Sequence, residues 1–240
     1  MTTINSEDKE KLAQNNYKLQ VGAVISPMLQ KIATFFSIIF HPVLLILYIY
    51  LMLALINPYF FGKTNFQSVL ADKHDLGVFI LLGFLLVLLP LFGLLIMRGL
   101  NMISSIKLEQ RQERIAPYIV IGLAYLVCYM HLNAYTAAPL VVKLYVLGAT
   151  IGIAMAFFVN LFAKISIHSV GMGGWVAFTL LALLNTNNLG ENDVFILPLV
   201  IFIAGLVGTA RRLLAAHQPQ ELYLGYFIGF FAQFLAANFV

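Results

Sequence analysis

The sequence predicts an all-α fold, a polytopic bundle of transmembrane helices. Of its 240 residues, 61% are hydrophobic and only 10% are charged, and the mean hydropathy of +0.92 lies outside the usual range of soluble domains. The apolar residues also gather into runs close to the roughly 20 residues that a helix needs to cross a bilayer. Helices are expected there because backbone polar groups in lipid must be hydrogen-bonded within their own segment.

We expect about seven spans, with six as the alternative count, at 33–56, 76–98, 115–133, 138–163, 169–185, 194–210 and 222–240. The first run contains His41-Pro42, and a kink is expected there because proline lacks a backbone donor and crowds the preceding turn. The fifth run begins with the small residues Gly171, Gly173 and Gly174. Such a face favours close packing between helices.

The chain divides into a polar N-terminal tail, 1–30, and a transmembrane domain, 31–240. The tail is either an amphipathic surface helix or a segment without fixed structure, and the sequence leaves both open. The only cysteine, Cys128, lies inside an apolar run, which excludes an intrachain disulfide.

Three polar islands interrupt the apolar pattern, and because polar groups beside lipid are costly, they are the best indication of function. They are Lys107 with Arg114, then Ser166, Ile167 and His168, then Arg211, His217 and Glu221. Two spans separate the first island from the second, and two more separate the second from the third. The sequence therefore predicts one composite site built from three loops on the same side of the membrane.

The basic residues predict the orientation. Of the 14 Lys and Arg residues, only Lys63, Lys73 and Lys143 fall on the side opposite the N-terminus. The positive-inside rule then places the N-terminus in the cytoplasm, in a multi-pass protein that we expect in a bacterial inner membrane. Membrane lipids are the expected partners, nucleic acid is not, and the oligomeric state stays open.

The first two islands each allow a functional and a plain interpretation. Lys107 and Arg114 are seven residues apart, so on a helix they would share a face and grip one phosphate, but a juxtamembrane basic cluster is the alternative. Ser166 and the backbone N–H of Ile167 suit an oxyanion at a helix N-terminus, and His168 suits proton donation. An N-cap serine with an interfacial histidine is the plain alternative.

The third island is the most informative. His217 and Glu221 are four residues apart, so on a helix the carboxylate reaches the imidazole, fixes its tautomer and leaves the other nitrogen free to attack. Pro219 is tolerated if the next helix begins there. An ordinary His–Glu pair in an interfacial loop is the alternative, and a zinc site from His168, His217 and Glu221 is disfavoured by its ligand spacing.

In order and spacing, the three islands resemble the motifs of the type 2 phosphatidic acid phosphatase superfamily, over about residues 100–225. The resemblance implies that His217 forms a phosphohistidine, that Glu221 orients it and that His168 protonates the leaving group. It implies no metal and no cofactor. The residues that correspond to the phosphate cradle are Lys107, Arg114, Ser166, Ile167 and Arg211.

Four positions depart from the family pattern. Two residues separate Arg114 from Pro117, Ile167 replaces a glycine, Ala210 replaces a serine, and Glu221 replaces an aspartate. The expected function is that of a metal-independent membrane phosphatase acting on a lipid phosphate or pyrophosphate. The alternative is a catalytically inactive phospholipid-binding or transport protein with a degraded site.

Overall fold

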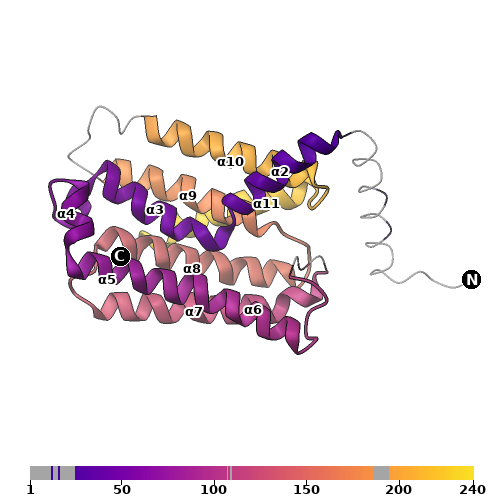
Figure 1. Cartoon of the computed structure of the whole chain (residues 1–240), viewed down its shortest axis with the longest axis horizontal. Coiled ribbons are helices and arrows are strands. Elements are labelled where there is room, and N and C mark those ends of the chain that lie inside the picture. Colours follow the sequence, from indigo (N-terminus) through magenta and orange to yellow (C-terminus); the bar gives the residue numbers. More distant parts are fainter. Residues whose placement is uncertain (1–11, 13–15, 17–24, 107, 109, 186–194) are drawn as a thin grey trace, which may run out of the picture.

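The computed structural model describes residues 12, 16, 25–106, 108, 110–185 and 195–240, and all of its regular elements are helical (Figure 1). The predicted tail therefore falls largely outside the described residues, and Lys107 does as well. The described helices are α2 (Pro27–Ile39), α3 (Pro42–Ile56), η1 (Pro58–Phe61), α4 (Phe66–Ala71), α5 (Lys73–Leu82), the π-helix η2 (Gly83–Leu88), α6 (Leu89–Gly99), η3 (Gln112–Arg114), α7 (Ile115–Ala134), α8 (Leu140–Asn160), α9 (Ile167–Leu184), α10 (Ile196–Leu213) and α11 (Pro219–Ala236).

Among the residues that the structure describes, five stretches are long and apolar enough to cross a membrane: Lys73–Gly99, Gln112–Ala134, Leu140–Asn160, Ile167–Leu184 and Ile196–Leu213. The bent pair of α2 and α3 makes a sixth if it counts as one span. The chain is thus a multi-pass helical membrane protein, and the alternative count of six is better supported than seven.

The seventh predicted span, 222–240, corresponds to α11 but is not among these stretches. Its helix contains Gln220, Glu221 and Gln233, which reduce its hydropathy. Gln233 is only 1% exposed, and its Nε2 donates to the carbonyl oxygen of Tyr145 in α8 at 3.2 Å. The bundle interior therefore supplies a hydrogen-bond acceptor for one of the polar side chains that lower the hydropathy of α11.

The first predicted span is not one straight helix. Helices α2 and α3 meet at an angle of 64°, and the break falls at Phe40 and His41, directly before Pro42. The kink predicted at His41-Pro42 is confirmed. It is large because Pro42 starts a new helix whose N-cap is His41, with the side-chain Nδ1 accepting from the N–H of Val43 at 3.4 Å.

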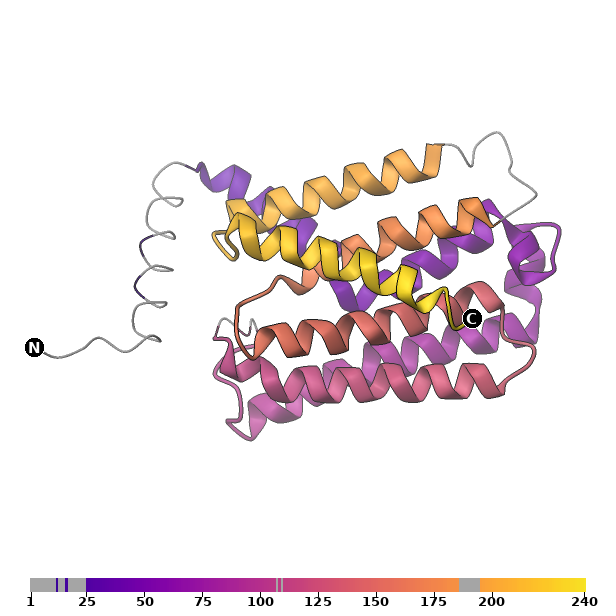
Figure 2. The same ribbon diagram turned by 180° about the vertical axis from the view of Figure 1, so that it is seen from behind.

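Helices α9 and α11 make the closest packing contact in the bundle, with α10 on one side of α9 and α8 beside α11 (Figures 1 and 2). A Cβ atom on Gly229 would overlap the carbonyl oxygen of Val170, and one on Gly173 would overlap the backbone of Tyr226. The predicted role of the small residues in helix packing is confirmed. This contact fixes the N-terminal ends of α9 and α11 side by side.

Candidate functional site

The loops that carry the islands lie at one end of the bundle, the end at which α2 begins (Figure 2). Hydrogen bonds join the first loop to the second. Asn160 donates through Nδ2 to the carbonyl oxygen of Arg111 at 3.1 Å, and Arg111 donates through Nη1 to that of Leu161 at 3.0 Å. For the described residues of the three islands, the predicted placement on the same side of the bundle is confirmed.

The described residues of the first island do not form a continuous helix. Leu108 has a positive φ of 48°, and only Gln112–Arg114 forms a short 3-10 helix. Because Lys107 lies outside the described residues, the expectation that it shares a helix face with Arg114 stays a prediction. Arg114 reaches across the loops, where Nε donates to the carbonyl oxygen of Leu108 at 2.8 Å and Nη1 to that of Ile165 at 2.9 Å.

The second island forms the N-terminus of α9. Ser166 is fully buried and is the N-cap, and its hydroxyl accepts from the N–H of Ser169 at 3.4 Å. Ile167 is the first residue of the helix, so its N–H belongs to the first turn, whose donors have no partner within the helix. The positive end of the α9 dipole therefore lies at this island.

The third island brings its two titratable side chains into contact. His217 lies in the turn before α11, and its Nδ1 is 2.5 Å from Oε2 of Glu221 in the first helical turn. The pair forms across the helix start, and not along one helix as the spacing suggested. The Glu221 carboxylate also accepts the backbone N–H of Gln218, the N-cap position, so one carboxylate caps the helix and holds the imidazole.

The charges around His217 come from the first and third islands and from Lys164, just before the second island. Burial lowers the pKa of His217 well below its ordinary value of 6.5, and the positive charges of Arg114, Arg211 and Lys164 lower it further. A neutral imidazole facing a carboxylate must donate through Nδ1–H, which leaves the lone pair on Nε2. Lys164 was not among the expected site residues, although it lies only two residues before Ser166.

Helix α2 supplies a contact that the sequence interpretation missed. Arg211 donates through Nη1 to the hydroxyl of Ser37 at 2.7 Å, and Nε2 of His168 lies 3.1 Å from the Ser37 carbonyl oxygen. The ring of His41 packs edge-on against His168, with centroids 5.1 Å apart. Ser37 and His41 are polar residues inside an apolar run, which is the one signal that could have identified them.

The structure thus brings together seven of the eight predicted site residues, while Lys107 lies outside the described residues. The seven are Arg114, Ser166, Ile167, His168, Arg211, His217 and Glu221. Within the described ranges no three His, Cys, Asp or Glu side chains are grouped as a metal site requires.

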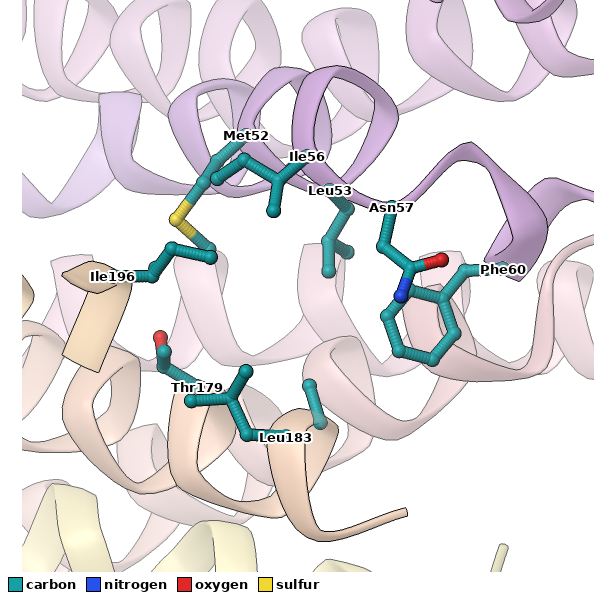
Figure 3. Close-up of a pocket in the computed structure, with 9 residues that line it drawn as sticks. Met52, Leu53, Ile56, Asn57, Phe60, Thr179, Leu183 and Ile196 are labelled. Atoms are coloured by element: carbon teal, nitrogen blue, oxygen red, sulfur yellow. The ribbon is translucent and has the colours of Figure 1, made fainter. Parts of the chain in front are cut away.

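A cavity of about 30 Å³ lies at the opposite end of the bundle, between α3, α9 and the start of α10 (Figure 3). Its lining is mostly aliphatic, with Asn57 and Thr179 as the polar members. It holds no more than two or three waters, at roughly 10–15 Å³ each. The polar islands and this cavity are therefore separate features.

No protein-family model, curated protein or solved structure matches this chain. The case for its function rests on the site itself.

Proposed function

We propose that this protein is a membrane lipid phosphatase that hydrolyses a phosphate or pyrophosphate group of a lipid through a phosphohistidine, without a metal ion. The observation that carries the proposal is the contact between the buried His217 and the half-buried Glu221, with the guanidinium of Arg211 close by. A neutral imidazole held at Nδ1 by a carboxylate is the arrangement that activates Nε2 as a nucleophile.

The chemistry follows from the roles of the residues. Nε2 of His217 attacks the phosphorus, and the bond from phosphorus to the ester or bridging oxygen breaks. His168 enters this step as the imidazolium and gives the proton on Nδ1 to the departing oxygen. Water then attacks the phosphohistidine, His168 takes a proton from that water, and inorganic phosphate leaves with His217 restored. Glu221 stabilises the positive charge that the imidazole acquires in the first step.

The phosphoryl oxygens need donors on several sides, and the site offers them. Nε of Arg211 is buried and has no hydrogen-bond partner within the described part of the chain. The N–H of Ile167 and the hydroxyl of Ser166 lie at the positive end of α9. Together with Arg114 and Lys107, these groups form the proposed phosphate cradle, which stabilises charge in the transition state.

The substrate class follows from the position of the site. The polar islands lie at the end of a multi-pass helical bundle, so a headgroup can enter from the membrane surface while its hydrocarbon tail stays between lipid and helices. The proposed location is a bacterial inner membrane with the N-terminus in the cytoplasm, because Lys and Arg residues concentrate at this end.

A phospholipid-binding or transport protein without catalytic activity is the second candidate. Two observations favour it. Nε and Nη1 of Arg114 donate to backbone carbonyl oxygens, a bracing role. Ile167 also stands where the family that the motifs resemble has glycine, which narrows the space beside the backbone N–H. This candidate requires headgroup binding that survives loss of the His217 imidazole.

The decisive experiment measures phosphate release by the purified protein from phosphatidate, phosphatidylglycerol phosphate and polyprenyl pyrophosphate, with EDTA present. We expect release by the wild type and a loss of at least about 10³-fold in His217→Ala. His131→Ala is the matched control, because His131 is exposed in the last turn of α7, at the other end of the bundle. Release abolished by EDTA, or unchanged in His217→Ala, would contradict the proposal.

A further inference from the structure

Ser37 differs from its neighbours on α2. Phe35 and Ile38 are 59% and 62% exposed, as expected for a lipid-facing helix, whereas Ser37 is only 7% exposed. Helix α2 packs against α10, and this contact turns Ser37 toward the polar islands. A serine buried at this position therefore contributes to the site and not to the membrane surface.

The two polar groups of Ser37 contact two different helices. Its hydroxyl accepts from Nη1 of Arg211, in α10, at 2.7 Å, and also lies 3.4 Å from Nε2 of His168. Its carbonyl oxygen lies 3.1 Å from Nε2 of His168, in α9, and the carbonyl can only accept, so Nε2 carries the hydrogen. One residue of α2 thus holds a proposed phosphate ligand and the proposed proton donor.

The break before Pro42 makes the carbonyl available. In a continuous helix the N–H of His41 would donate to the carbonyl oxygen of Ser37, four residues earlier. Here that N–H donates to Ile38 at 3.2 Å, since the chain turns into α3. The carbonyl of Ser37 is therefore one of the last-turn acceptors that need a partner from outside the helix, and His168 provides it.

We propose that Ser37 is a positioning residue of the site. Its hydroxyl fixes the guanidinium of Arg211 so that Nε, which has no partner among the described residues, faces the phosphoryl group. Its carbonyl, freed by the helix break, fixes the imidazole of His168. The inference rests on the proposed phosphatase function, and it makes the kink of the first span part of the catalytic architecture. Ser37 itself takes no part in bond making or breaking.

The test compares Ser37→Ala with Arg211→Ala and with the double variant. Removing the hydroxyl should raise KM for the lipid phosphate about 10-fold, with a smaller effect on kcat, because the guanidinium loses a charge-assisted hydrogen bond. In the Arg211→Ala background the same substitution should have almost no further effect. Ser37→Thr, which retains the hydroxyl, should recover most of the loss.

The matched control is Thr34→Ala. Thr34 lies on the same helix, is exposed, and its hydroxyl donates within the helix, to the carbonyl oxygen of Gln30 at 2.8 Å. We expect wild-type KM and kcat for this variant. Ser37 and Arg211 effects that simply add, or a Thr34→Ala effect as large as that of Ser37→Ala, would overturn the proposal in favour of a general packing role for α2.

A binding measurement separates this inference from the function on which it rests. Orthovanadate or inorganic phosphate is titrated onto the His217→Ala protein, with and without Ser37→Ala, and thermal stabilisation is recorded. Weaker binding on loss of the hydroxyl supports the positioning role of Ser37 even if no lipid is hydrolysed. Absence of lipid hydrolysis would contradict only the proposed phosphatase function. Equal affinity in the two proteins, or no binding by either, would overturn the role of Ser37.

Discussion

The backbone N–H of Ser166 donates to the carbonyl oxygen of Glu221 at 3.3 Å, which joins the second polar island directly to the third. This bond links the N-cap of α9 to the first turn of α11, two helices that start at the same end of the bundle. Because both partners are backbone atoms, the bond depends on how closely the helices approach and not on the side chains. The glycines of the α9–α11 contact therefore support the site from within the membrane.

A side chain at Gly229 should damage both stability and activity. A Cβ atom there would overlap the Val170 carbonyl oxygen, so Gly229→Ala must push α11 away from α9, at a cost of about 1–3 kcal/mol. We expect a lower unfolding midpoint, which Trp175 fluorescence can monitor, and slower phosphate release. Gly205→Ala is the control, because a Cβ there meets nothing within 4 Å. Equal stability of the two variants would refute this packing argument.

Ala215→Gly should stabilise the protein. Ala215 follows α10 with a φ of 47°, in the left-handed region that costs a residue with a Cβ roughly 1–2 kcal/mol. Glycine accepts this conformation without strain, so the unfolding midpoint should rise by the equivalent of about 1 kcal/mol. The neighbouring substitution Ala216→Gly should give no gain, since Ala216 has no positive φ. A lower midpoint for Ala215→Gly would contradict the prediction.

Activity should persist below the pH at which an ordinary histidine becomes protonated. The proposed nucleophile, His217, must be neutral, and burial together with nearby positive charges holds its pKa well below 6.5. Falling pH should therefore leave the rate of phosphate release unchanged through pH 6.5 and reduce it only at lower pH. Lys164→Gln removes one of those charges, so its acidic limb should move to higher pH. An acidic limb at or above pH 6.5 in the wild type speaks against His217 as the nucleophile.

Glu221→Gln removes the negative charge of the carboxylate while it keeps the size and shape of the side chain. The amide oxygen can still accept from Nδ1 of His217, but it carries no charge to stabilise the cationic imidazole, so kcat should fall by about 10²–10⁴-fold with little change in KM. Thermal unfolding provides the folding check, because the same side chain also caps α11. A kcat within threefold of the wild type would remove Glu221 from the mechanism.

Cysteine labelling tests on which side of the membrane the third island lies. Gln218 is exposed between His217 and α11, and the native Cys128 is fully buried, so Gln218→Cys creates one accessible thiol. An impermeant maleimide should label it only in inverted vesicles, as expected for a cytoplasmic loop. Lys73→Cys, at the other end of the bundle, should show the reverse pattern. Labelling of Gln218→Cys from outside intact cells would overturn the proposed orientation.

Local properties of the sequence were enough to predict much of this fold. The length and apolar content of the runs determine the transmembrane helices, because each helix satisfies its own backbone in lipid. Pro42 determines the break in the first span, since it has no N–H to continue α2. The count of spans between the islands determines that they share one end of the bundle. None of these features requires knowledge of a contact between distant residues.

The remaining features depend on contacts between segments far apart in the chain. Only the tertiary structure places Ser37 between Arg211 and His168, because the packing of α2 on α10 decides which residue of an apolar helix faces the islands. Only the loop geometry places the Arg114 guanidinium against the carbonyl oxygens of Leu108 and Ile165, because no spacing in the sequence indicates these contacts. The sequence therefore determined which residue types reach this end of the bundle, and packing decided which of them meet.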